Sequence, residues 1–492
     1  MKRRGGGALL TVALDPASIR PLYAQLTDAV RQAIQGGALQ PGARLPATRV
    51  LAAELGVSRN TVVAMADQLL AEGLLVARVG DGTFVARGPA SPPTPTSATS
   101  EVETDAEAEG ELHDLSVRGT RFASGGVEGA ESLAPFVPDL PALDAFPMAE
   151  WSRLAGLAWR NVTPAMLARP EAAGWAPLRA TIAGQLAAGR GLAVAPDQVV
   201  VTSGTSQSLD LVTRLLLDRG ETVWLEDPGY IGARSVFTAG GARLVPVPVD
   251  AEGLDVEAGL RTDPAPRLIF VSPSRQYPLG VTMSLARRRR LLEIAERTGA
   301  WIIEDDYDWE FRYAGQPLPA LAALNPARVV HVGTYSKTLL PGLRLGYLVV
   351  PAPLAATFAS AKGVVDRHPP LIEQMTLHEF MESGRYGAHV RQMRQLYARR
   401  QQAAVAALRN ALDAREQVAA AETGMHLLIW LRPGLDDRQV AETARRRGVT
   451  VRPLSPYYMG ARQRQALLAG FAAHPEERFP LAAERLSLAL KA

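Results

Sequence analysis

One segment constrains the architecture of this chain more than any other. Residues 89–110 read PASPPTPTSATSEVETDAEAEG and contain almost no side chain that a core could bury. Such a composition cannot offset the entropy lost on ordering. Long loops without secondary structure are also uncommon inside compact domains, which disfavours the alternative of a surface loop. The sequence therefore predicts an acidic, disordered linker over residues 89–112, between a head (15–88) and a body (113–492).

Composition excludes several classes of protein. The 492 residues are 47% hydrophobic and 21% charged, which favours packed globular domains. There is no cysteine, so disulfides, thiolate zinc sites and cysteine nucleophiles are excluded. The apolar stretch near the start is too short for a signal peptide, and no run reaches the ~20 apolar residues of a membrane-spanning helix. We expect a soluble, cytoplasmic protein.

The head has the pattern of a small helical domain. Helical periodicity over residues 21–34 and 47–55 predicts two helices, with Val50, Leu51 and Leu55 of the second facing inward. A third helix can be capped by Ser58 and ends at Gly73. The two helices on either side of the turn at residue 56 form a helix-turn-helix.

A hairpin and a basic charge balance complete the head. Extended runs over residues 74–79 and 83–86 surround Gly80-Asp81-Gly82, which predicts a β-hairpin, or wing. Residues 1–88 hold ten Lys/Arg against six Asp/Glu, a net charge of +4, whereas residues 89–112 hold six acidic and no basic residues. This asymmetry permits a nucleic-acid partner for an α+β winged domain.

The first turn of the third helix is polar and precedes the apolar stripe that begins at Val62. In a helix-turn-helix this turn faces base edges in the major groove, although a merely solvated helix start is the alternative. The residues PGARLPATRVLAAELGVSRNTVVAMADQLLAEGLL resemble the winged helix-turn-helix of the GntR family of bacterial regulators over essentially the whole head. That resemblance implies binding to double-stranded DNA through Arg44, Arg49, Ser58, Arg59, Asn60, Thr61 and Gly80.

The body alternates apolar strand-like runs with helical patterns. Such alternation predicts an α/β fold with a mostly parallel sheet and helices on both faces. Ligands of such sheets bind at the carboxyl ends of strands. The predicted strands are residues 198–202, 222–225, 268–271, 301–304, 329–332 and 346–350.

Three of these strands are followed by residues that carry chemistry. The turn 202–207 precedes a helix and could hold a phosphate, although most such turns contain Gly and Ser for steric reasons. The acidic cluster 304–308 needs a counter-charge, for which a metal is improbable and a buried pyridinium ring is a candidate. Lys337 could be a desolvated nucleophilic amine and Arg344 a phosphate ligand, or Lys337 could simply be exposed. One ligand, pyridoxal 5'-phosphate, requires all three features.

The body resembles the fold-type I, class I aminotransferases. Its segments LEDPGYIGAR, SPSRQYPLGVTMS, IIEDDYDWEFRY and GTYSKTLLPGLRLGY, behind a GntR-type head, resemble the MocR family of transcription regulators, with its GabR-like and PdxR-like members. The resemblance implies a Schiff base of pyridoxal phosphate with Lys337 and pairing of Asp305, with Asp306 as the fallback, with the ring nitrogen. The other implied ligands are Tyr307 and Gln276 near the ring hydroxyl, Tyr230 stacked on the ring, and Gly204, Thr205, Ser206, Thr334 and Arg344 at the phosphate.

One departure concerns the substrate. Aminotransferases bind a carboxylate with an arginine before a Gly-aromatic-Ala segment, but residues 466–472 read ALLAGFA, without an arginine at the expected place. Arg452 and Arg464 could substitute from a distance, although an arginine there is more often a surface charge. The preferred hypothesis is therefore a regulator, by family precedent a head-to-tail homodimer, that senses the cofactor or an amino compound. A working aminotransferase with an accessory DNA-binding module is the alternative.

Overall fold

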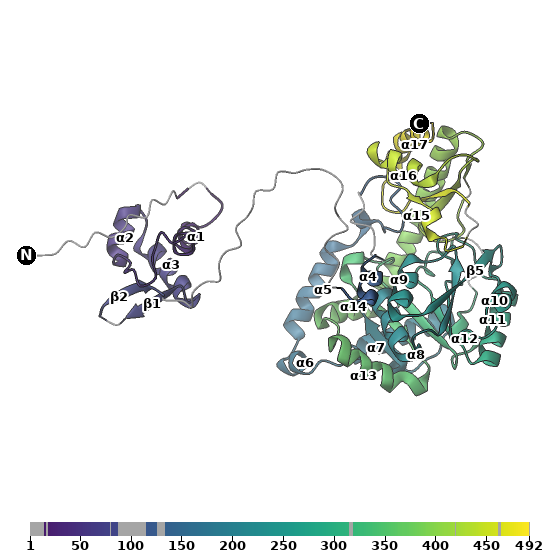
Figure 1. Ribbon diagram of the computed structural model, residues 1–492, viewed down its shortest axis with the longest axis horizontal. Coiled ribbons are helices and arrows are strands. Elements are labelled where there is room, and N and C mark those ends of the chain that lie inside the picture. Colours follow the sequence, from purple (N-terminus) through teal and green to yellow (C-terminus); the bar gives the residue numbers. More distant parts are fainter. Residues whose placement is uncertain are drawn as a thin grey trace, which may run out of the picture. The chain divides into compact units, whose positions relative to one another are not determined.

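The computed structural model describes residues 14–15, 18–78, 80–86, 115–124, 133–313, 318–418, 420–460 and 464–491. Contacts divide the chain into two compact units, Met1–Glu107 and Ala108–Ala492, shown in Figure 1. The predicted linker over residues 89–112 lies outside the described residues, so its disorder and its limits stay predictions.

The head contains the three predicted helices and the hairpin. Helices α1 (Leu22–Gln35), α2 (Thr48–Leu55) and α3 (Arg59–Ala71) precede strands β1 (Leu75–Arg78) and β2 (Gly82–Val85), which pair antiparallel. Gly56 ends α2 in the left-handed conformation that a tight turn requires. The prediction that Val50 faces inward is wrong. Its side chain is 49% exposed, because Leu51, Ala52 and Leu55 form the stripe of α2 that contacts the core.

An eight-stranded sheet forms the centre of the body and confirms the predicted α/β class. Its order is β3-β10-β9-β8-β7-β4-β5-β6. Strand β10 runs antiparallel to its two neighbours and β6 antiparallel to β5, while all other pairs are parallel. The strands are β3 (Val199–Thr202), β4 (Thr222–Asp227), β5 (Arg243–Asp250), β6 (Gly253–Leu254), β7 (Leu268–Val271), β8 (Trp301–Asp305), β9 (Val329–Thr334) and β10 (Gly346–Val349).

Helices cover both faces of this sheet, as predicted. Neighbouring strand residues belong to different apolar clusters: Ile302 packs in the cluster with α7, α11 and α14, and Ile303 in the cluster with α8, α9 and α13. This alternation is the period of a β-strand buried on both sides. These helices are α7 (Ala176–Arg190), α8 (Thr205–Leu216), α9 (Ile231–Gly240), α11 (Leu285–Thr298), α13 (Ala355–Asp366) and α14 (Leu371–Glu382).

A second sheet lies in the C-terminal part of the body and was not predicted from the sequence. Its strands β11 (Gln417–Val418), β12 (His426–Trp430), β13 (Arg452–Pro453) and β14 (Ala466–Gly470) follow the order β11-β12-β14-β13. Its register sets Arg452 of β13 opposite Leu468 of β14. Helices α15 (Arg385–Ala411), α16 (Asp437–Arg446) and α17 (Phe479–Leu490) share an apolar cluster with Leu427 and Leu467 of this sheet, and their labels lie in the same part of the body in Figure 1.

The described part of the body contains further α-helices. They are α4 (Val117–Ser124), α5 (Met148–Asn161), α6 (Pro164–Ala168), α10 (Val256–Thr262) and α12 (Leu321–Leu324). Helix α4 contacts α9, and the labels of the two helices are adjacent in Figure 1. Within the described ranges, no helix has the length and apolar character that crossing a membrane requires.

Candidate functional site

Five parallel strands bring predicted cofactor ligands to one edge of the large sheet. The turn at Gly204 follows β3, Tyr230 follows β4, Gln276 follows β7, Asp305 ends β8, and Lys337 follows β9. Carboxyl ends of parallel strands meet at the same edge, where α/β proteins bind ligands. The order and direction of the strands thus bring residues that are far apart in the sequence to one edge of the sheet.

The turn after β3 is shaped to hold an anion. Gly204 precedes α8 with φ 119°, and a Cβ atom placed on it would lie 3.3 Å from Nη2 of Arg344, so the guanidinium packs directly against the turn. The first N–H groups of a helix, here those of Thr205 and Ser206, have no partner within the helix and attract anions. Thr334, at the end of β9, accepts a hydrogen bond from the Ser336 N–H at 3.2 Å. Arg344 itself has a left-handed backbone, φ 50°, which is rare for a side-chain-bearing residue.

Asp305 is a buried carboxyl group whose Oδ1 atom has no hydrogen-bond partner among the described residues. The residue is 5% exposed. Burial, followed by repulsion from Asp306 and Asp308, raises the pKa of Asp305 to about 8 even though the charge of Lys337 lowers it. The hydroxyl of Tyr307 is likewise buried without a partner in the described ranges. These two groups fit a ligand that carries both a cation and a hydrogen-bonding hydroxyl.

The fallback residue, Asp306, is already neutralised. Its Oδ2 atom lies 2.7 Å from Nε of Arg190, and both side chains are almost completely buried. A buried ion pair of this kind leaves no charge for a ring nitrogen to balance. The geometry therefore favours Asp305 over Asp306.

Lys337 lies in the turn after β9, and its Nζ atom donates to the backbone carbonyl of Asp139 at 3.0 Å. The Asp139 carboxylate accepts from the Tyr277 hydroxyl at 2.7 Å and from Nη1 of Arg452 at 2.8 Å. Burial alone would raise the pKa of Asp139, but the charges of Lys337, His426 and Arg452 hold it well below its usual value. Asp139 and Tyr277 were not predicted as site residues, because Asp139 sits alone in a proline-rich stretch and no local motif marks it.

Tyr230 and Gln276 have different surroundings. Tyr230 is the N-cap residue of α9, and burial followed by the charges of Asp305 and Asp139 raises its pKa to about 12 against a hydrogen bond with Ser206. The amide of Gln276 holds its own loop, because Nε2 donates to the carbonyls of Pro228 and Tyr277 and Oε1 accepts from the Leu279 N–H. A contact of Gln276 with a ring hydroxyl stays a prediction that these bonds do not favour.

The two candidate arginines of the C-terminal part are separated by the structure. Arg452 points at Asp139 and Tyr277, within the site, and its strand neighbour is Leu468. The Arg464 guanidinium instead stacks on the Trp430 ring, with its carbon 3.8 Å from the ring centroid. Within the described part of the chain, no group of three or more His, Cys, Asp and Glu residues could hold a metal ion.

The start of α3 presents two exposed side chains for base contact. Arg59 and Asn60 occupy its first two positions. Ser58 caps the helix by accepting from the Thr61 N–H at 3.1 Å, and the hydroxyls of Ser58 and Thr61 lie 2.9 Å apart. The predicted DNA contacts of Ser58 and Thr61 therefore compete with a capping role.

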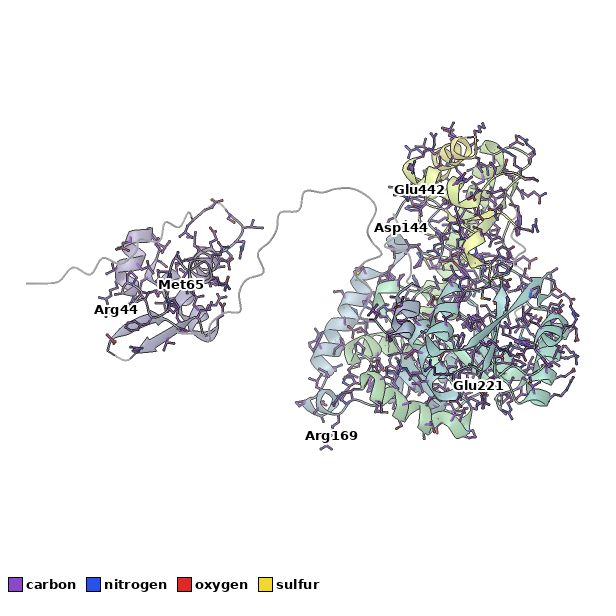
Figure 2. The ribbon with its side chains drawn as sticks, viewed as in Figure 1. Arg44, Met65, Asp144, Arg169, Glu221 and Glu442 are labelled. Carbon is purple, nitrogen blue, oxygen red and sulfur yellow. The ribbon has the colours of Figure 1, made fainter. Side chains whose placement is uncertain are left out.

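Other predicted DNA ligands lie near the hairpin. Arg49 is exposed on α2, and Gly80 has φ 79° at the tip of the hairpin. Arg44, labelled in Figure 2, pairs by a β-bridge with Phe84 and lies close to Gly82. Arg78 was not predicted, and its guanidinium carbon lies 4.8 Å from the centroid of the Phe84 ring. Arg44 and Arg78 thus place two cations over one hairpin ring.

Replacing Asp305 with asparagine tests the raised pKa. The carboxyl group of an unfolded Asp ionises near pH 3.8, whereas that of folded Asp305 stays protonated to about pH 8. In cofactor-free protein this difference lowers the free energy of unfolding by an amount that grows from pH 3.8 to about pH 8 and is constant above pH 8. We expect Asp305→Asn to raise the thermal unfolding midpoint of cofactor-free protein by an increment that grows from pH 5 to pH 8. Asp306→Asn is the control and should lower the midpoint, because it leaves the buried Arg190 guanidinium without the carboxylate that lies 2.7 Å from its Nε atom. A pH-independent increment for Asp305→Asn would contradict the assignment.

Comparisons with known proteins match both parts of the chain. Residues 22–85 match the family model "Bacterial regulatory proteins, gntR family", and residues 169–486 match "Aminotransferase class I and II". The chain is 39% identical to the probable rhizopine catabolism regulatory protein MocR of Rhizobium meliloti, over 94% of this chain and 92% of that protein. It is 32% identical to the pyridoxine biosynthesis transcriptional regulator PdxR of Corynebacterium glutamicum, over 95% and 96% of the two chains.

A solved structure matches the body. The α-aminoadipate aminotransferase LysN of Thermus thermophilus, complexed with N-(5'-phosphopyridoxyl)-L-leucine, superposes with a TM-score of 0.67 at 29% identity. The match covers 76% of this chain and 95% of that one.

Proposed function

The chain belongs to the MocR family of transcription regulators, and from this premise we propose that its body binds pyridoxal 5'-phosphate and senses that cofactor or an amino compound to control the head on DNA. The observation that carries the proposal is the convergence of Lys337, Asp305 and Arg344 at one edge of the sheet. Oδ1 of Asp305 and the Tyr307 hydroxyl, which have no hydrogen-bond partner among the residues that the structure describes, fit the polar atoms of the cofactor. Its phosphate fits the turn that Gly204 forms against Arg344.

Each ligand has a distinct task in this proposal. Bound to Lys337, the cofactor would supply a carbon that reversibly captures primary amines. Asp305 balances the charge of the ring nitrogen, Tyr307 holds the ring hydroxyl, and Tyr230 covers the ring. The phosphate is held by Gly204, Thr205, Ser206, Thr334 and Arg344.

We propose Arg452 as the ligand for an acidic group of the amino compound. Leu468, its neighbour on β14, cannot bind an anion. Arg452 is connected to Lys337 through Asp139, and because Nη1 of Arg452 lies 2.8 Å from the Asp139 carboxylate, a bound anion would compete with Asp139 for the guanidinium. Guanidinium groups bind carboxylates through paired, charge-assisted hydrogen bonds. An effector that carries both an amine and an anionic group can therefore contact Lys337 and Arg452 together.

Replacing Arg452 tests this role. A carboxylate raises the pKa of a cationic group beside it, so acetate bound at Arg452 should move the pH midpoint of the visible absorbance of cofactor-loaded protein upward. We expect Arg452→Gln to raise the acetate concentration that gives half of this effect by about 10- to 100-fold, because charge-assisted hydrogen bonds are lost. Arg464→Gln, which removes the arginine on Trp430, is the matched control. An acetate response that Arg464→Gln loses and Arg452→Gln keeps would reverse the assignment.

The partners in this proposal are operator DNA and a second copy of the chain. Family precedent is a head-to-tail homodimer acting in the cytoplasm. The body exposes large apolar side chains that suit such a partner: Met148 and Trp159 on α5, Leu167 on α6 and Val364 on α13.

Two measurements distinguish a transcription regulator from a working aminotransferase. DNase footprinting upstream of the protein's own gene should give protection that depends on the head. Multiple-turnover transamination with common amino donors should stay near the rate of free cofactor. Sustained turnover without a footprint would favour the enzyme.

A further inference from the structure

We propose that Asp227 is a positioning residue that fastens residues 457–460 to the start of α9 and so keeps Arg452 aimed into the site. The inference rests on the anion-binding role of Arg452 proposed above. Asp227 is the last residue of β4, three positions before Tyr230, and its carboxylate accepts two consecutive backbone N–H groups from the C-terminal part of the chain. Oδ1 accepts from Met459 at 2.7 Å and Oδ2 from Gly460 at 3.0 Å.

Two more hydrogen bonds fasten the same segment to the same loop. The Gly229 N–H donates to the Tyr457 carbonyl at 3.2 Å, and Nη1 of Arg234 on α9 donates to the Tyr458 carbonyl at 3.4 Å. Backbone groups of four consecutive residues, 457–460, are therefore held by the stretch from β4 to α9. A carboxylate that accepts two N–H groups supplies the strongest of these bonds, because charge-assisted hydrogen bonds exceed neutral ones.

The fit at Gly460 is tight. A Cβ atom placed there would lie 2.8 Å from Oδ2 of Asp227, a separation that real Cβ atoms essentially never show. An alanine at position 460 would push the carboxylate away from both N–H groups. A substitution at Gly460 is therefore an independent way to break the hydrogen bonds between Asp227 and residues 459–460.

The proposed anion ligand, Arg452, lies shortly before the fastened segment in the sequence. Arg452 lies five positions before Tyr457, and the Tyr457 hydroxyl lies 3.1 Å from that of Tyr277, which donates to Asp139. In this proposal a change in what Arg452 binds reaches Tyr457 through the Tyr277 hydroxyl, and Asp227 connects residues 459–460 to the loop that carries Tyr230. Such coupling requires that the anion favour one of two arrangements of the segment.

The connection also extends away from the site. Tyr230 is the N-cap of α9, and α9 contacts α4, the first described helix after the predicted linker. In this proposal a shift of α9 would reach α4, and Asp227 connects the anion ligand to these two helices.

Asp227→Ala in cofactor-loaded, full-length protein tests the proposal. We expect the acetate concentration that gives half of the absorbance effect to rise about tenfold. We also expect the ratio of operator affinities between cofactor-loaded and cofactor-free protein to move toward one. Gly460→Ala should reproduce both changes, which keeps the test decisive if Asp227→Ala folds poorly. Asp250→Ala, at the carboxyl end of the neighbouring strand β5, is the control and should change neither quantity.

The possible results distinguish a failure of the positioning role of Asp227 from a failure of the anion-binding role of Arg452. If the wild type responds to acetate and both variants respond equally, Asp227 has no positioning role and the inference is overturned while Arg452 keeps its assignment. If the wild type itself shows no acetate response, the role of Arg452 fails and the inference fails with it. An altered acetate response with an unchanged operator ratio would overturn the route through α9.

Discussion

Replacing Lys337 with alanine should abolish covalent retention of pyridoxal phosphate. The wild type, mixed with the cofactor and desalted, should keep visible absorbance, whereas Lys337→Ala should lose it completely, because a Schiff base needs a primary amine. The chain contains four lysines, Lys2, Lys337, Lys362 and Lys491, so borohydride reduction followed by peptide mapping identifies the modified residue without ambiguity.

The structure supplies the control for this experiment. Lys362, the alternative amine nearest in sequence, lies on α13 with Nζ 2.6 Å from Oδ1 of Asp366, and it is not among the residues at the edge of the sheet. Lys491→Ala should retain full absorbance. Label on Lys362, or a coloured Lys337→Ala protein, would overturn the assignment of the whole site.

Replacing Arg59 with alanine should weaken operator binding by about 1 to 3 kcal/mol, roughly 5- to 150-fold, if it makes a bidentate base contact. Arg59 is exposed at the first position of α3, where a helix-turn-helix meets base edges. Affinities must be compared at one salt concentration, because phosphate contacts depend steeply on salt.

The pattern of loss identifies the kind of contact. Gln68→Ala, an exposed change further along α3, should leave affinity unchanged. A loss for Arg59→Ala that is equal on operator and unrelated DNA would indicate a phosphate contact. No loss on either DNA would remove α3 from the interface.

Local patterns predicted most of the architecture. The helices of the head and six strands of the large sheet were found because each carries its own periodicity and its own Gly or Ser boundary. Strand β5 was missed since it contains Pro246 and Pro248, which cannot donate to a ladder and argue against a strand one position from the sheet edge. The C-terminal sheet was missed because two of its strands are only two residues long.

The site was predictable where it depends on motifs and not where it depends on distant contacts. Residues beside strand ends, such as Asp305 and Lys337, could be found from the sequence. Asp139 could not, because its bonds reach 138 positions to Tyr277 and 313 positions to Arg452. No spacing in the sequence reports a contact of that length.

The mutual hydrogen bond between Ser58 and Thr61 limits how much information one head can read. Because base contacts of these hydroxyls compete with the helix cap, Arg59 and Asn60 are the side chains of that turn most available to bases, and each can discriminate about one base pair. A half-site of so few specified positions recurs by chance throughout a genome. Selective control of a gene by this protein therefore demands several half-sites at a set spacing, and operator searches should score pairs of short repeats and their separation before any single motif.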